Sequence, residues 1–239
     1  MAVAHDAVSE SHTSGSSASE ASFSWTHTPV GTPRGVLVFT YNSGTVEDAL
    51  SVTYGGVSLT AVPGGRAVDT AGEPAGCTAW FLGSSIPTGA QSVVVNRTND
   101  VSLMIAQCVT VTAASDTTTG TPVLVQEDGT VAEQSVDDGS PGTNSVRYAG
   151  FYSGSATGSM ATGANSTLIK DSAWTAASDI KLARETTAGQ GSRLVGFSYG
   201  TTDDRAGVHL AVKEVATTPT HIGAAFSDPE LPEALMLPY

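Results

Sequence analysis

The stretch Ser51-Val52-Thr53-Tyr54-Gly55-Gly56-Val57-Ser58-Leu59-Thr60 shows most directly how this chain folds. Polar and apolar residues alternate on both sides of Gly55-Gly56, as they do in strands that bury one face. A two-residue Gly-Gly loop can adopt the positive φ angles of a primed turn, whose twist matches that of paired antiparallel strands. The stretch therefore predicts a β-hairpin.

Short apolar segments of this kind, each closed by a turn containing Gly or Pro, recur from residue 36 to residue 215. Residues 36–41 and 103–111 are apolar on both faces, which predicts central strands covered on both sides. The segments 63–75 and 155–166 are expected to be loops. Further strands are expected at residues 77–82, 92–96, 122–126, 146–152, 179–185, 192–199 and 208–215. This pattern predicts an all-β fold, an antiparallel β-sandwich.

The chain is expected to have one domain with an arm at each end. Residues 23–215 are assigned to a single β-sandwich domain, because all-β domains of this length are common as single units. Residues 1–22 are rich in Ser, Ala and Thr, which favours a flexible N-terminal arm.

Residues 216–239 differ in composition from the rest of the chain. Their four prolines break strands and helices, yet their large apolar side chains would be poorly solvated alone. We expect this C-terminal extension to dock onto a neighbouring subunit, with packing on its own domain as the alternative. The candidate partner-contact residues are Phe226, Leu231, Leu235, Met236 and Leu237.

Charge and composition restrict the partners of the chain. Ten Lys and Arg against 23 Asp and Glu give a formal net charge of −13 over 239 residues. Such a chain is repelled by phosphate backbones and by anionic lipid surfaces, so neither nucleic acid nor a membrane is an expected partner. Charged residues make up only 14% of the chain, which favours packing against other proteins. The N-terminus has no secretory signal pattern, so we expect synthesis in a cytoplasm.

The sequence lacks the spacing patterns typical of zinc sites, thiol redox sites and nucleophile elbows. We therefore expect a non-enzymatic protein without a cofactor. His209 lies in a predicted strand, where a solvent-facing or hydrogen-bonded histidine is expected. Acidic pairs in turns leave two alternatives open: a carboxylate pair for glycoside hydrolysis, or Ca²⁺ binding. Solvated turn carboxylates are the favoured interpretation. These pairs are Glu47-Asp48, Glu127-Asp128, Asp137-Asp138 and Asp203-Asp204.

The cysteines and tryptophans give weaker evidence about the core and about ligand binding. Cys77 and Cys108 each lie in an apolar strand segment, which predicts two buried thiols and leaves a disulfide open. Three tryptophans offer a platform on which a sugar ring can stack. Trp80 lies in an apolar run that favours core packing, whereas Trp174, beside a polar loop, is the better candidate for an exposed ring.

Several segments together resemble a group of β-sandwich proteins encoded in tailed-bacteriophage genomes and related metagenomic sequences. The resemblance covers about residues 20–215 and is more specific in the first half. It is carried by the opening Met1-Ala2-Val3-Ala4 and by residues 25–29, 31–38, 52–60, 80–83, 86–91 and 207–215.

The resemblance implies a jelly-roll-like sandwich that acts as a structural virion protein on the outside of the particle. Its first expectation is a head decoration or cement protein that stabilises the capsid, with capsid subunits and further copies of itself as partners. The alternative is a minor tail protein, or a host adhesin or carbohydrate-binding module with a host glycan as partner. The group has no established catalytic residues, so the resemblance assigns none here.

Overall fold

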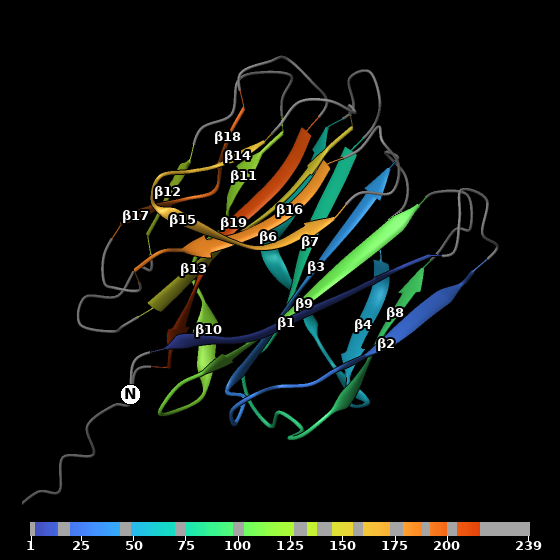
Figure 1. Cartoon of the computed structure of the whole chain (residues 1–239). Helices are drawn as coiled ribbons and strands as arrows, with labels where there is room; N and C mark the ends of the chain where they lie inside the picture. Colours follow the sequence, from blue (N-terminus) through green and yellow to red (C-terminus); the bar gives the residue numbers. More distant parts are fainter. Residues whose placement is uncertain are drawn as a thin grey trace, which may run out of the picture.

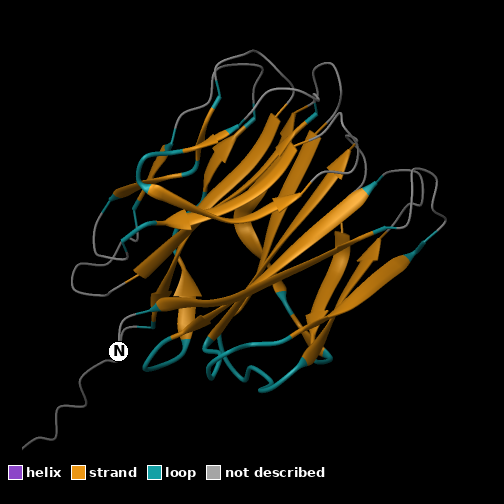
Figure 2. Cartoon of the chain, in the orientation of Figure 1, coloured by secondary structure: helices purple, strands orange, loops and turns teal. Residues whose placement is uncertain are grey.

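The computed structural model describes residues 3–13, 20–43, 49–69, 75–97, 103–126, 133–137, 145–154, 160–172, 179–187, 192–199 and 205–215. The regular elements in these residues are antiparallel strands, as Figures 1 and 2 show. The described part of the chain has no helix that is long and apolar enough to cross a membrane. The predicted all-β fold is therefore confirmed.

Three antiparallel sheets form the main layers. The central sheet has the strand order β1 (Ala4–His12), β9 (Met104–Thr112), β3 (Gly35–Ser43), β7 (Ala75–Leu82) and β6 (Thr60–Asp69). The four-stranded sheet has the order β2 (Ser22–His27), β8 (Gln91–Arg97), β4 (Ala49–Tyr54) and β5 (Val57–Ser58). The six-stranded sheet has the order β10 (Thr117–Thr119), β19 (Arg205–Glu214), β13 (Ser145–Ser153), β16 (Asp179–Glu185) and β15 (Ser166–Ser172), with β11 (Val123–Val125) also paired to β19.

Two short strand pairs add an outer layer. They are β12 (Gln134–Val136) with β17 (Arg193–Val195), and β14 (Ala161–Thr162) with β18 (Phe197–Ser198). Phe197 and Val195 pack with Phe151 of β13 in one hydrophobic cluster. The outer pairs therefore cover the face of the six-stranded sheet that points away from the central sheet.

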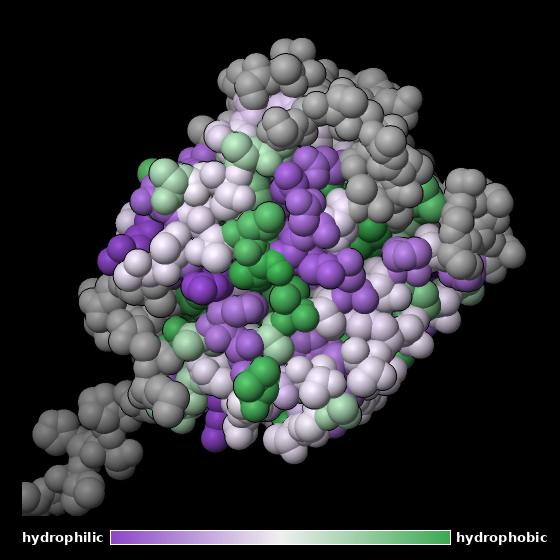
Figure 3. Space-filling model, viewed as in Figure 1, coloured by the Kyte–Doolittle hydropathy of each residue, from purple (hydrophilic) through white to green (hydrophobic). Residues whose placement is uncertain are grey.

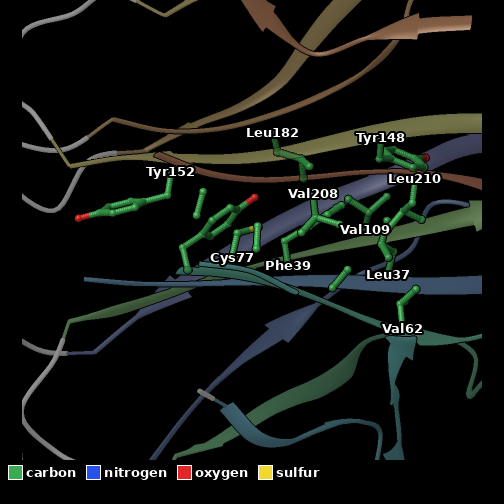
Figure 4. Packing of buried hydrophobic residues seen from close by; sticks show 14 of the residues in the cluster. Leu37, Phe39, Val62, Cys77, Val109, Tyr148, Tyr152, Leu182, Val208 and Leu210 are labelled. Carbon is green, nitrogen blue, oxygen red and sulfur yellow. The ribbon is translucent and has the colours of Figure 1, made fainter. Parts of the chain in front are cut away.

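The central sheet is buried on both faces because its strands alternate between two hydrophobic clusters. In β3, Leu37 and Phe39 pack toward the six-stranded sheet, whereas Val36 and Val38 pack toward the four-stranded sheet. Figure 4 shows Leu37 and Phe39 directed toward Leu210 and other side chains of the six-stranded sheet. Strand β9 alternates in the same way. Both strands predicted to be covered on two sides are confirmed, and the layers form a β-sandwich. The jelly-roll connectivity stays a prediction.

The hairpin at Gly55-Gly56 is confirmed. Strand β4 pairs with β5 through Tyr54 and Val57, and the loop residues Gly55 and Gly56 have φ angles of 56° and 81°. Both values lie in the left-handed region that favours glycine, as a primed two-residue turn requires.

Replacing Gly55 by Ala is expected to lower the free energy of unfolding by about 1–2 kcal/mol, because a side chain at this φ is strained. The added Cβ would also lie 2.5 Å from Oε1 of Gln91. Urea denaturation followed by circular dichroism measures the change. The matched control is Gly56→Asn, since Asn tolerates positive φ and a Cβ at Gly56 meets nothing within 4 Å. Equal losses in both variants would contradict this account.

The expectation of a flexible N-terminal arm over residues 1–22 is wrong for residues 4–12. Residues 4–12 form β1, which pairs with β9 from Ala4↔Thr112 to His12↔Ile105. The Ser- and Ala-rich composition hides this strand because its order comes from backbone pairing with a buried neighbour. Val8 adds packing against the main hydrophobic cluster.

Two expected loops also contain strands. Strand β6 extends to Asp69, with its register shifted between Ala61 and Arg66, where Pro63-Gly64-Gly65 forms an irregular bulge. Glycine and proline at a bulge or an edge strand are compatible with pairing on either side. Within 155–166, Ala161–Thr162 form β14. The expected strand 192–199 is divided into β17 and β18 at Gly196, whose φ is 132°.

Candidate functional site

The predicted contact residues of the C-terminal extension, Phe226, Leu231, Leu235, Met236 and Leu237, lie outside the described residues. The described chain ends at Val215, directly after β19. The surface around this exit point is therefore where a candidate site can be built from observed geometry. This surface contains a hollow.

The hollow consists of two adjoining cavities of about 660 and 510 Å³, which together we call the edge groove. The two cavities share Val62, Pro63 and Thr119 in their walls. The larger one extends over residues 119–123 and Lys213. The smaller one extends over residues 81–84 and 116–118 to Val215.

The edge groove lies between the edges of two stacked sheets. Strand β6 is the last strand in the order of the central sheet, and β10 is the first in the order of the six-stranded sheet. Behind these edges, β6 pairs with β7 and β10 pairs with β19, and β7 and β19 pack against each other across the sandwich. Edge strands are surfaces on which another extended segment can dock. Pro63 lies in the bulge of β6 at the mouth of the groove.

The opposite side of the sandwich is closed by side-chain contacts. There the edge strands are β1 and β15. Nζ of Lys170 lies 2.9 Å from Oε1 of Glu10, and Ser172 also donates a hydrogen bond to Glu10. Nε2 of Gln107 donates to Oγ of Ser172 over 3.2 Å. In Figure 3 this side faces the viewer, and its surface is mostly pale or purple with a narrow green band in the middle. The two sides therefore differ in the described residues. An ion pair and side-chain hydrogen bonds join β1 to β15. On the groove side, β6 is linked through hydrogen bonds from Gln126 to the Arg66 carbonyl and from the Arg205 backbone to Asp69.

Sequence reasoning did not find a partly buried series of hydrogen bonds between the central and four-stranded sheets. Oγ of Ser9 donates to Nδ1 of His27 over 2.7 Å, and Nε2 of His27 lies 3.1 Å from Oγ1 of Thr110. Thr110 in turn donates to Oδ2 of Asp6 over 2.9 Å. Because the threonine proton goes to Asp6, the histidine proton must sit on Nε2. The residues are far apart in sequence, so no local motif announces them.

A serine that donates a hydrogen bond to a histidine is also the arrangement of an activated nucleophile. Nε1 of Trp25 donates to Oγ of Ser9 over 2.8 Å, which engages the oxygen that would attack a substrate. Burial lowers the pKa of His27, while the Asp6 carboxylate acts in the opposite direction. We interpret this series of hydrogen bonds as structural: it holds β1 against β2.

The expectation for His209 is wrong, because its side chain is fully buried and neither ring nitrogen has a hydrogen-bond partner among the described residues. The ring packs edge-on against Phe151, with 6.5 Å between the ring centroids. Burial lowers the pKa of His209 to about 4, against a smaller opposing effect of the Val123 backbone. Strand position alone cannot reveal this environment, because the outer strand pairs cover this face.

The two predicted buried thiols are confirmed. Cys77 and Cys108 are both free and fully buried. They lie on β7 and β9, on either side of β3, and their side chains belong to different hydrophobic clusters. Since those clusters lie on opposite faces of the central sheet, the two sulfur atoms cannot form a disulfide in this fold.

The predicted aromatic and acidic candidates do not assemble a site. Trp80 is 7% exposed and packs in the core as expected. Trp25 is half-buried and stacks on Phe23 at an interplanar angle of 14°, while Trp174 lies outside the described residues. Of the four acidic pairs, only Asp137 lies within the described residues. Those residues contain no group of three or more His, Cys, Asp or Glu side chains that could hold a metal ion.

The chain was compared with protein-family models, curated proteins and solved structures. No family model, curated protein or solved structure matched it. The edge groove and the buried polar networks are the features of the described residues that bear on function.

Proposed function

We propose that this chain is a non-enzymatic structural protein on the exterior of a tailed-bacteriophage particle. Its role is that of a head decoration or cement protein, which stabilises the capsid by joining neighbouring subunits. In this proposal its partners are major capsid subunits and further copies of the same chain. It is made in the cytoplasm of the host bacterium and ends up in the virion.

The observation that carries the proposal is the edge groove beside the point where the C-terminal extension begins. A groove of about 660 and 510 Å³ between two sheet edges offers a surface for an extended segment. The chain supplies a segment rich in large apolar residues immediately after Val215. Arms that become ordered on a neighbour enlarge the buried interface between subunits, which is how a cementing protein adds stability.

The net charge of the chain and the packing of its core support the same structural role. A net charge of −13 favours a position on the outer surface, away from packaged DNA. The central sheet is packed on both faces, so the fold supplies a well-packed body for such a structural role. The serine of the Ser9–His27 pair also accepts a hydrogen bond from Nε1 of Trp25, which supports a structural role for this pair.

Immunogold electron microscopy of intact particles tests the proposal, with an antibody raised against residues 36–215. Label scattered over the heads is the expected result. Label confined to tails would replace the head assignment by a minor tail protein or adhesin, and binding to host polysaccharide would then be measured. Particles without label would contradict an exterior position altogether.

A further inference from the structure

We propose that the edge groove binds the C-terminal segment, residues 216–239, of a second copy of this chain. The inference rests on the proposed function, because it identifies the surface through which neighbouring copies are joined. Each copy then carries one donor segment and one acceptor groove. Such a head-to-tail contact closes into rings or extends into arrays, depending on the rotation between copies.

The donor segment starts at the wall of the groove. Val215 lines the smaller cavity, and its side chain is 46% exposed. Its backbone N–H donates to the carbonyl oxygen of Asp116 over 2.9 Å, so the exit point of the chain is fixed on the sheet. Residues 216–239 follow. A segment of this length extends at most about 80 Å, which is enough to reach a neighbouring domain of this size.

The direction of β19 favours a second copy over the same chain. His209 of β19 pairs with Val123 beside the larger cavity, and Glu214 pairs with Thr117 beside the smaller one. The strand therefore runs along the groove from the larger cavity to the smaller one and leaves at the far end. A segment of the same chain must reverse its direction to cover the larger cavity. A segment of a second copy can enter the groove without this reversal.

The walls suit a proline-containing apolar segment. Val62, Pro63 and Phe81 contribute apolar surface, while Thr119 contributes a hydroxyl group. Prolines lack an N–H group, so a segment with four of them binds through side-chain packing more than through a regular strand ladder. Its large apolar residues, Phe226, Leu231, Leu235, Met236 and Leu237, would lose contact with water in the groove.

Cysteine cross-linking tests the proposal on the full chain. Both native cysteines are fully buried, and burial raises the pKa of each thiol well above its usual value, so the background reaction is low. One variant carries Ala61→Cys, an exposed position that lines the smaller cavity. The other carries Leu235→Cys in the C-terminal segment. The two variants are mixed, oxidised mildly and separated on a non-reducing gel.

We expect a disulfide-linked dimer between the two variants, at least tenfold more abundant than with the matched control Ser24→Cys. Ser24 is exposed on β2, in the four-stranded sheet and outside the walls of the groove. Thr119→Cys, which lines both cavities, provides a second acceptor position in case Ala61→Cys alters the edge strand. Thermal unfolding of each variant confirms that it is folded before mixing.

Two results would overturn the proposal. A disulfide that forms within the double variant Ala61→Cys/Leu235→Cys at high dilution, but not between mixed single variants, would assign the segment to its own groove. Equal cross-linking at the groove and at Ser24 would show that the groove is not the acceptor. This outcome can be distinguished from that of the proposed function. Head label without cross-linking would contradict only the proposal that the groove binds the C-terminal segment. Cross-linking without head label would contradict only the proposed role in the virion.

Discussion

Replacing Arg147 by Met is expected to lower the free energy of unfolding by about 3–5 kcal/mol, because it breaks a buried ion pair from one side. Arg147 is fully buried on β13, and its Nη1 lies 3.2 and 3.1 Å from the two carboxylate oxygens of Glu185 on β16. Its Nε donates to the carbonyl oxygen of Val136 in the outer strand pair over 3.0 Å. Chemical denaturation in guanidinium chloride at pH 7 measures the loss.

The loss of stability arises because the substitution leaves the Glu185 carboxylate buried without its cation. Glu185 is 2% exposed, and burial raises the pKa of its carboxyl group while the Arg147 guanidinium opposes that rise. Without Arg147, the carboxylate must stay buried without its cation or take up a proton. The backbone N–H of Arg147 donates to Oε1 of Glu185 over 3.0 Å, and the Met variant keeps this single contact.

Two further variants separate the ion pair from general packing. In the double variant Arg147→Met/Glu185→Leu the buried charge is absent, and we expect most of the lost stability to return. Arg66→Met removes an exposed arginine from β6 and is expected to change the free energy of unfolding by less than about 1 kcal/mol. A double variant as unstable as Arg147→Met would show that the arginine contributes through its packing and its other contacts.

The strands with the clearest patterns could be predicted from the sequence because each strand's periodicity is a local property. Strand β3 alternates Val36 and Val38 against Leu37 and Phe39, and the structure divides these residues between two clusters as the alternation requires. The Gly-Gly hairpin was equally predictable, since its two φ angles depend on the loop residues themselves. Such features need no knowledge of strand pairing.

The networks and the groove could not be predicted because they depend on which strands become neighbours. Arg147 and Glu185 are 38 residues apart, and Asp6 and Thr110 are 104 residues apart. Register between β13 and β16, and between β1 and β9, brings these groups together. Strand β1 itself was missed for the same reason, since its Ser-rich sequence is ordered by β9. The edge groove likewise exists only because β6 and β10 end their sheets on the same side.

The wild-type protein is expected to lose stability between pH 7 and pH 4, and His209→Leu is expected to remove much of that loss. Burial holds the pKa of His209 at about 4 in the folded protein, against 6.5 as the ordinary value that applies after unfolding. The unfolded chain therefore binds the proton first as the pH falls. Stability from the neutral ring is fully present above pH 6.5, declines below it, and is lost by about pH 4. The shift corresponds to a loss on the order of 3 kcal/mol.

Urea denaturation of both proteins at pH 7, 6, 5 and 4 provides the measurement. At pH 7 we expect little cost for Leu, because it replaces a ring whose nitrogens have no hydrogen-bond partner among the described residues. His5 and His27 also contribute in this pH range. Burial, followed by the nearby Arg184 charge, lowers the pKa of His5 to about 4, and burial lowers the pKa of His27. His209→Leu should therefore reduce the pH dependence while His5 preserves part of it, and His5→Gln combined with His209→Leu should reduce it further. Parallel stability curves for wild type and His209→Leu would show that the buried ring does not control the acid response of this sandwich.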